Sequence, residues 1–401
     1  MACLIKAPQG DAKGVVSFTT PERDHLIRVF PDIAAAVRRL KPRYLTGLHH
    51  NWHDGQFLHD PLFDFNLAGE DDLAAADGKP FPLIPMDACN FSPPIFVPGG
   101  DKFWDVLFVA RGVRFKGIPE FFRAIRALYD DGDFLRVLVL CPLPPPGTGT
   151  EEGVRALYES LFNAEERALF TFLTMDWDYP FPLDMPTLAH FYRSSRVFVH
   201  SAPDERRCRV AAYAWASAIP VVGMACIGSV LPPALRVAPY FFECENYETF
   251  PHAIRAAVAA AAAQPDFGPV RRQVSASEAA GVLEKFLGDL ARTGEARLSS
   301  APINATGFDL RLGRHHGLAV GSNRIEQDLG AFIEALEKLS SEELCDVAED
   351  AEPERKIAAL FPVAPRPAEE RSAHAGSFGM QLRLKAGAIL RAVGARDSRG
   401  D

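Results

Sequence analysis

The feature that most constrains the fold is a regular alternation of two kinds of segment between residues 104 and 290. Short continuous apolar runs, such as DVLFVA and FLRVLVL, alternate with longer stretches in which apolar residues recur every three or four positions. Continuous apolar runs are typical of strands in a parallel sheet that helices cover on both faces. The pattern therefore predicts an α/β domain, and ligands of such sheets bind beyond the carboxyl ends of the strands.

A turn rich in cations follows the first of these strands. Arg111, Arg114 and Lys116 lie between the run that ends at Ala110 and the helical segment that begins at Ile118. Arginine offers a planar pair of donors to phosphate, and lysine offers a compact charge. A cation pair at this edge of the sheet is suited to a diphosphate. The alternative is a solvated surface turn whose cations are incidental.

A second candidate segment starts where the run RVFVH ends at His200. It continues with a polar loop that carries Glu205, an alanine-rich helical segment and a strand that opens at Pro220. Alanines let a helix pack close to a sheet, and the amides at a helix N-terminus attract anions. Glu205 can accept hydrogen bonds from sugar hydroxyls, or it can simply favour the helix dipole.

Charge and cysteine content exclude several classes of function. The formal net charge of -9 disfavours nucleic acid or an anionic membrane as the main partner. The seven cysteines include no CxxC pair, which favours reduced thiols over a disulfide framework or a zinc site. The first residues lack the apolar core of a signal peptide, and no apolar run reaches membrane-spanning length. We expect a cytoplasmic protein without a transmembrane segment, and peripheral contact with a membrane stays open.

The segments on either side of the alternating region are less regular. Residues 1–100 contain one amphipathic stretch and the strand-like run RYLTGL, so we expect a small α/β domain there. Residues 101–292 form the predicted Rossmann-like domain. Residues 293–401 end in a segment rich in proline, alanine and charge, and we expect a C-terminal extension that is helical and partly mobile.

Taken together, the two candidate segments resemble the nucleotide-binding half of GT-B glycosyltransferases, specifically the large family 4. The family has Gly-Arg-x4-Lys-Gly after the first strand of its second domain, and Arg111 and Lys116 keep this spacing. Its later pattern has two glutamates separated by seven residues. Glu205 stands at the first of them and Tyr213 at the second. The resemblance covers about residues 82–290.

The resemblance implies two Rossmann-like domains that face a cleft, with a trimmed N-terminal domain on the acceptor side. In the family the Arg and Lys grip the donor diphosphate and the first glutamate touches the sugar, roles that fall to Arg111, Lys116 and Glu205. The second glutamate touches the ribose. Tyr213 could offer only a hydroxyl there. The run IGSVLPPAL, which contains Gly228 and Ser229, is similar to the loop whose amides approach the donor.

Histidine and aspartate gather after RYLTGL, where the family has a strand end that faces the cleft. His49, His50, His53 and Asp54 are of types that bind metals, but their spacing matches neither HExxH nor other zinc patterns. We favour contacts to substrate in the cleft, then a loop of solvated histidines, then a metal site. An imidazole here, with His50 as the candidate, could move a proton at neutral pH.

The resulting hypothesis is a metal-independent, cofactor-free glycosyltransferase of glycan biosynthesis. It would move a sugar from a nucleotide-diphosphate-sugar to the hydroxyl of a glycan or other acceptor, and the resemblance implies retention of the anomeric configuration. Arg111, Lys116 and backbone amides would neutralise the charge that grows on the diphosphate. Two alternatives stay open: a catalytically inactive binding or scaffold protein, and a nucleotide-sugar epimerase on the same fold.

Overall fold

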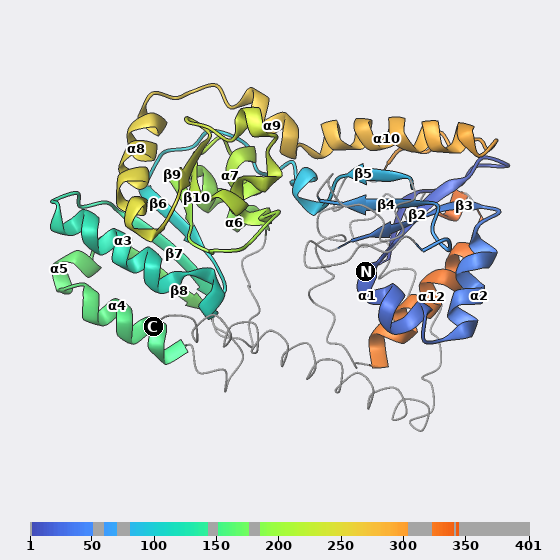
Figure 1. The fold of residues 1–401 in the computed structure, drawn as a ribbon, viewed down its shortest axis with the longest axis horizontal. Coiled ribbons are helices and arrows are strands. Elements are labelled where there is room, and N and C mark those ends of the chain that lie inside the picture. The colour runs from blue at the N-terminus through green and yellow to red at the C-terminus, as the bar shows by residue number, and fades with distance from the viewer. Residues whose placement is uncertain are drawn as a thin grey trace, which may run out of the picture.

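The computed structural model describes residues 2–50, 60–69, 81–142, 151–175, 185–303, 323–340 and 342–344. It shows two α/β domains side by side (Figure 1). None of the helices in these ranges is long and apolar enough to cross a lipid bilayer.

The first domain is built on a five-stranded sheet with the strand order β1-β2-β3-β4-β5. β1 pairs antiparallel to β2, and the remaining strands pair parallel to their neighbours. A short α1, a π-helix η1 and the amphipathic α2 connect β2 to β3. The bounds are β1 Cys3–Lys6, β2 Gly14–Thr19, α1 Thr20–Glu22, η1 Arg23–Ile27, α2 Pro31–Leu40, β3 Tyr44–His49, β4 Phe65–Ala68 and β5 Leu83–Pro85.

Two helices from later in the chain complete this first domain. α10 (Ala276–Thr293) buries Leu283 and Leu287 among side chains of β1 to β5. α12 (Asn323–Lys338) packs against α2, and the Tyr44 hydroxyl donates to the carbonyl of Leu336 at 3.0 Å. Figure 1 shows both helices beside the first sheet. The structure thus differs from the predicted boundaries, which placed residues 276–292 with the second domain and treated residues from 293 onward as a separate extension.

The second domain holds a six-stranded sheet with the order β11-β10-β9-β6-β7-β8, in which all neighbours pair parallel. One buried cluster lies against α6, α7 and α9 and another against α3 and α8, so helices cover both faces. The strands are β6 Trp104–Val109, β7 Val137–Pro142, β8 Phe170–Met175, β9 Ser195–His200, β10 Val221–Met224 and β11 Phe241–Cys244. The predicted fold class is confirmed.

The helices of this domain alternate with the strands, as the sequence pattern predicted. Short 3-10 helices fill several connections. The bounds are η2 Ala88–Asn90, η3 Arg114–Lys116, α3 Ile118–Asp130, α4 Glu151–Leu161, α5 Ala164–Arg167, α6 Met185–Arg193, α7 Arg209–Ala216, η4 Ala225–Val230, η5 Pro233–Leu235, η6 Tyr247–Thr249, α8 Phe250–Ala262 and α9 Gly268–Val274. Strand order reverses between β6 and β9, and ligands of open α/β sheets bind at such a switch point.

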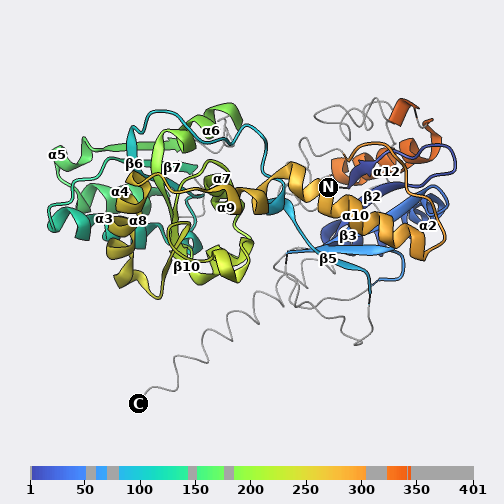
Figure 2. The same ribbon diagram turned by 90° about the horizontal axis from the view of Figure 1, so that it is seen from above.

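Within the described residues the chain crosses between the domains twice, and the two crossings touch. The first runs from β5 to β6, and the second passes from α9 into α10 (Figure 2). The amide of Ser92 in the first crossing donates to the carbonyl of Val274 in the second at 3.0 Å. This hydrogen bond joins the two crossing segments to each other.

Neighbouring residues of α10 test its place in the first domain. Leu283 is fully buried, whereas Val282 is 57% exposed. Removing a buried leucine side chain leaves a cavity, so Leu283→Ala should lower the free energy of unfolding by about 2–5 kcal/mol. Val282→Ala, the matched control, should change it by less than about 0.5 kcal/mol. Urea unfolding of both variants decides, and equal small effects would contradict the assignment of α10 to the core of the first domain.

Candidate functional site

The loops after β6 and β9 are locked together at the switch point. The Ser201 hydroxyl lies 2.7 Å from the carbonyl oxygen of Gly117 and 3.1 Å from that of Lys116. Gly117 has φ +65°, and a Cβ atom there would lie 2.1 Å from the Ser201 carbonyl oxygen. Only glycine fits this position without displacing backbone. The close approach of the loops therefore depends on Gly117.

Lys116 and Glu205 meet across this junction. The Lys116 Nζ atom lies 2.5 Å from Glu205 Oε2. His200, the last residue of β9, donates from Nε2 to the same oxygen at 2.6 Å, since a carboxylate oxygen can only accept. The exposed fractions of the three side chains are 14%, 16% and 0% for Lys116, Glu205 and His200. Water screens this cluster poorly, so its charges interact strongly.

The surroundings fix the protonation state of Glu205. Burial alone would raise its pKa, but the charges of His200 and Lys116 and their hydrogen bonds outweigh that effect. The pKa falls from an ordinary value of 4.5 to about 2. Glu205 is therefore a carboxylate, an acceptor of hydrogen bonds only, at any physiological pH.

A cysteine from η4 supports the backbone of this loop. The amide of Glu205 donates to the Cys226 sulfur at 3.4 Å, and the Cys226 thiol lies 3.5 Å from the carbonyl oxygen of Pro203. These contacts fix the loop through its main chain, in addition to the contacts of the Glu205 carboxylate.

The same cluster contains a set of potential metal ligands. Ligand atoms of His200, Glu205 and Cys208 lie within 4.8 Å of one another. However, the Lys116 ammonium already lies against the carboxylate, and a metal cation would be repelled by it. Burial also raises the pKa of the Cys208 thiol well above its usual value, whereas metals bind thiolates. The donor set suits an ammonium better than a metal ion.

Arg111 lies on the same turn as Lys116, at the carboxyl edge of the sheet, and its side chain is exposed. Phe115 is exposed as well, and its ring faces the Lys116 ammonium at 4.9 Å from the ring centre. The side chain of Arg114 lies outside the described residues. The turn thus offers one partly buried cation, Lys116, and one open to solvent, Arg111.

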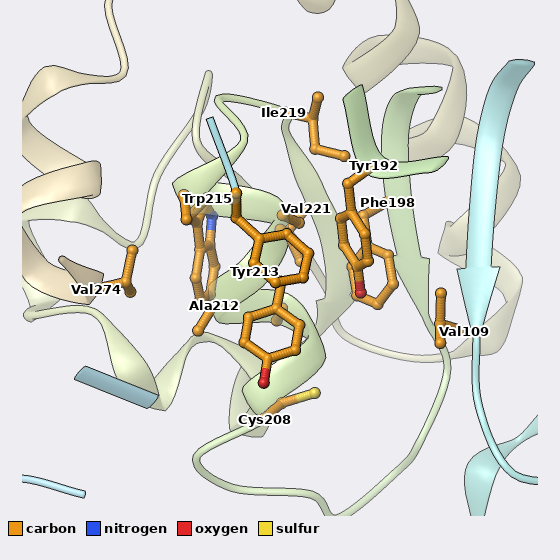
Figure 3. Packing of buried hydrophobic residues seen from close by; sticks show 14 of the residues in the cluster. Val109, Tyr192, Phe198, Cys208, Ala212, Tyr213, Trp215, Ile219, Val221 and Val274 are labelled. Carbon is orange, nitrogen blue, oxygen red and sulfur yellow. The ribbon is translucent and has the colours of Figure 1, made fainter. Parts of the chain in front are cut away.

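Tyr213 is buried in the core of the second domain, and its predicted contact with the donor stays a prediction. Its side chain is 4% exposed and belongs to the core between α7 and the sheet (Figure 3). The ring stacks on Phe96 with centroids 4.2 Å apart and planes 10° apart, and it meets Tyr192 edge-on. Aromatic stacking of this ring stabilises the core.

Gly228 and Ser229 have structural partners that the sequence did not reveal. A Cβ atom on Gly228 would lie 2.8 Å from the Phe241 ring, so the residue is small to fit the core. The Ser229 hydroxyl accepts from the amide of Arg207 at 2.7 Å. Their predicted approach to the donor stays a prediction.

The histidines at the end of β3 are buried in the first domain. His49 is 3% exposed and His50 is 2% exposed. A ring nitrogen of His50, Nε2, lies 3.1 Å from the Asn66 side-chain oxygen. In this conformation His50 is enclosed, so its predicted transfer of a proton to an acceptor stays a prediction. His53 and Asp54 lie outside the described residues.

Sequence reasoning missed the part that His200 plays. It read this residue only as the end of a strand. The available signal was a histidine at a strand terminus five residues before the candidate glutamate, at the edge where ligands bind. It also missed Arg207 and Asp87, whose contact joins distant segments.

Neither a protein-family model nor a curated protein sequence matches this chain. The structure is similar to the C-terminal domain of a glycosyl transferase group 1 family protein from Francisella tularensis, with 14% identity, a TM-score of 0.33, and coverage of 53% of this chain and 98% of that one. It is also similar to sucrose-phosphate synthase from Thermosynechococcus elongatus, with 15% identity, a TM-score of 0.45, and coverage of 66% and 71%. A third similar structure is the UDP-forming trehalose-phosphate synthase from Burkholderia xenovorans, with 14% identity, a TM-score of 0.45, and coverage of 65% and 71%.

The lowered pKa of Glu205 makes a prediction about stability and pH. A carboxyl whose pKa is lower in the folded state stabilises the fold above its ordinary pKa, and this contribution is lost as the pH falls toward the folded value. With a pKa of about 2 in the folded state, the contribution of Glu205 should fall by about 2 kcal/mol between about pH 6 and about pH 3. Urea unfolding at both pH values should therefore show a smaller loss of stability on acidification in Glu205→Gln than in the wild type.

The control for this experiment is Glu243→Gln, which changes an exposed carboxylate of β11. It should lose stability on acidification as the wild type does. If Glu205→Gln also follows the wild type, the carboxylate does not hold the two neighbouring groups as described.

Proposed function

We propose that the protein transfers a sugar from a nucleotide-diphosphate-sugar to a hydroxyl of an acceptor, without a metal. The observation that carries this proposal is the cluster of Lys116, Glu205 and His200 at the switch point between β6 and β9. This cluster combines a cation suited to phosphate with an ionised carboxylate suited to sugar hydroxyls.

Lys116 is placed to bind the donor diphosphate while it keeps its hydrogen bond to the Glu205 carboxylate. An ammonium has three hydrogen-bond donors, and one of them serves the carboxylate. The others can meet phosphate oxygens, and the exposed Arg111 on the same turn can add a bidentate contact. As the bond between sugar and phosphate breaks, these cations stabilise the charge on the leaving diphosphate.

Glu205 is placed to orient the sugar. Among the described residues, both charged partners of its carboxylate bind Oε2. This leaves Oε1 to accept a hydrogen bond from a sugar hydroxyl. His200 and Lys116 fix the rotamer of the carboxylate, so the acceptor is already oriented before the sugar arrives.

Metal independence is part of the proposal and is supported by the Lys116 ammonium, which supplies at Glu205 a positive charge that a metal ion could otherwise supply. Retention of configuration is proposed on the resemblance to family 4 alone.

One observation favours a second candidate, a catalytically inactive protein that binds nucleotide-sugars. Tyr213 stands where the resemblance places a ribose-binding glutamate, and the structure buries its ring in the core. Nucleotide binding without turnover would support this candidate. Turnover of donor to an epimer without an acceptor would support the epimerase instead.

The role of Lys116 predicts a loss of donor affinity. A panel of UDP-, GDP- and ADP-sugars would first be screened for a rise in melting temperature, since a ligand of the native state stabilises it. For the best of these, Lys116→Ala should weaken binding about tenfold to hundredfold in calorimetry, because a charged hydrogen bond to phosphate is lost. Arg123→Ala removes an exposed cation from α3 and should leave affinity unchanged. Equal affinities for all three proteins would contradict the proposal.

The role of Glu205 predicts a loss of turnover greater than the loss of binding. Glu205→Gln keeps the shape of the side chain and removes its charge. It should lower kcat by about 100-fold, whereas the affinity for free nucleoside diphosphate should change by less than about threefold. Steady-state kinetics and calorimetry give the two values. Parallel losses in both would indicate that Glu205 only supports the loop.

A further inference from the structure

Arg207, two residues after Glu205, forms a buried ion pair with the chain segment that crosses between the domains. Its Nε atom lies 3.0 Å from Asp87 Oδ2, and its Nη2 atom lies 2.8 Å from Asp87 Oδ1. Nη2 also donates to the Asn90 side-chain oxygen at 2.5 Å. The exposed fractions of the two side chains are 5% for Arg207 and 11% for Asp87. This is a bidentate contact, which fixes orientation as well as distance.

The backbone of Arg207 is held as firmly as its side chain. Its amide donates to the Ser229 hydroxyl at 2.7 Å, and its carbonyl accepts from the Cys89 thiol. Its φ is +51°, in the left-handed region that non-glycine residues seldom adopt. Such strain persists only where the surroundings enforce it, and it gathers at functional sites.

The end of β4 in the first sheet lies directly against this ion pair. A Cβ atom on Gly69, which follows β4, would lie 2.7 Å from Arg207 Cγ and 2.8 Å from Asp87 Oδ2. The buried His49 at the end of β3 interacts electrostatically with Asp87. The loop that carries Glu205 is therefore fitted to the carboxyl edge of the first sheet, with Arg207 as the connecting side chain.

We propose that Arg207 is a positioning residue that sets the orientation of Glu205 by holding the β9–α7 loop against Asp87. The proposal rests on the proposed function for its catalytic consequence. In this arrangement the loop is anchored at both sides of Glu205. His200 fixes the start of the loop within the second sheet, and Arg207 fixes its end to Asp87 in the crossing segment.

The alternative is a contact that only stabilises the fold. Breaking a buried ion pair destabilises a protein whatever its function, so a lower melting temperature does not distinguish the two. A positioning residue acts through Glu205, and its effect on turnover must therefore depend on Glu205 being present. A double-mutant cycle separates the two cases.

The experiment combines Arg207→Ala with Glu205→Gln and uses UDP-glucose as the donor and water as the acceptor of the glucosyl group, with release of UDP as the readout. In the wild-type background, Arg207→Ala should lower kcat by about 100-fold, because a catalytic group misplaced by 1 Å costs about that much. KM for UDP-glucose should change by less than about threefold. In the Glu205→Gln background the same substitution should lower kcat by less than about threefold. Equal losses in both backgrounds would overturn the proposal.

Further variants test whether the effect of Arg207→Ala comes from misfolding or from the loss of a positive charge in general. Arg207→Lys and Asp87→Asn keep the size of each side chain and should show the same dependence on Glu205. Arg206→Ala removes an adjacent, exposed arginine and should leave kcat unchanged. A loss in Arg206→Ala as large as in Arg207→Ala would overturn the assignment to the ion pair.

A second readout needs no activity. Hydrogen exchange of the amides of residues 201–208 should be at least about tenfold faster in Arg207→Ala than in the wild type, since the loop loses one anchor. If wild-type protein releases no UDP, the proposed glycosyl transfer fails for this donor, and hydrogen exchange then tests only whether Arg207 anchors the loop. Unchanged exchange in the loop would overturn it.

Discussion

The candidate site depends on the parallel pairing of β6 with β9. These strands are far apart in sequence but adjacent in the sheet, with Val106 opposite Val197 and Phe108 opposite Val199. The pairing brings their carboxyl ends, and hence Lys116 and Glu205, to one edge. The hydrogen bond from Ser201 to Gly117 then closes the gap between the loops. A shift of this register would separate the ammonium from the carboxylate, whatever the local structure of each loop.

Those parts of the fold that follow from local pattern could be predicted from the sequence. Continuous apolar runs gave β6 and β9, and the rule that parallel strands share a carboxyl edge placed Lys116 near Glu205. The boundaries of the domains could not be found in this way. α10 has an ordinary amphipathic pattern, and nothing in that pattern states which sheet its apolar face covers. Such a choice is decided by contacts between distant segments.

The site shows the same division between local and long-range information. Tyr213 was aligned with a ligand-binding position by spacing alone, whereas its ring stacks on Phe96, a residue of the first crossing. Arg207 and Asp87 are 120 residues apart, and each in isolation looks like a solvated charge. Burial turns this pair into a determinant of loop geometry, because a buried charge requires its partner. No sequence pattern in either segment indicates that burial.

The placement of α10 and α12 has a consequence for the nascent chain. The first sheet and α2 leave the ribosome early, but α10 and α12, which complete the cover of this sheet, are synthesised only after the whole second domain. Domains generally fold as units during synthesis, with the N-terminal one first. Here the order of folding is reversed. The second domain is continuous from β6 to α9, so it can fold before α10 and α12 are available to pack on the first sheet. Until α10 emerges, the apolar face of that sheet is open to chaperones and to aggregation.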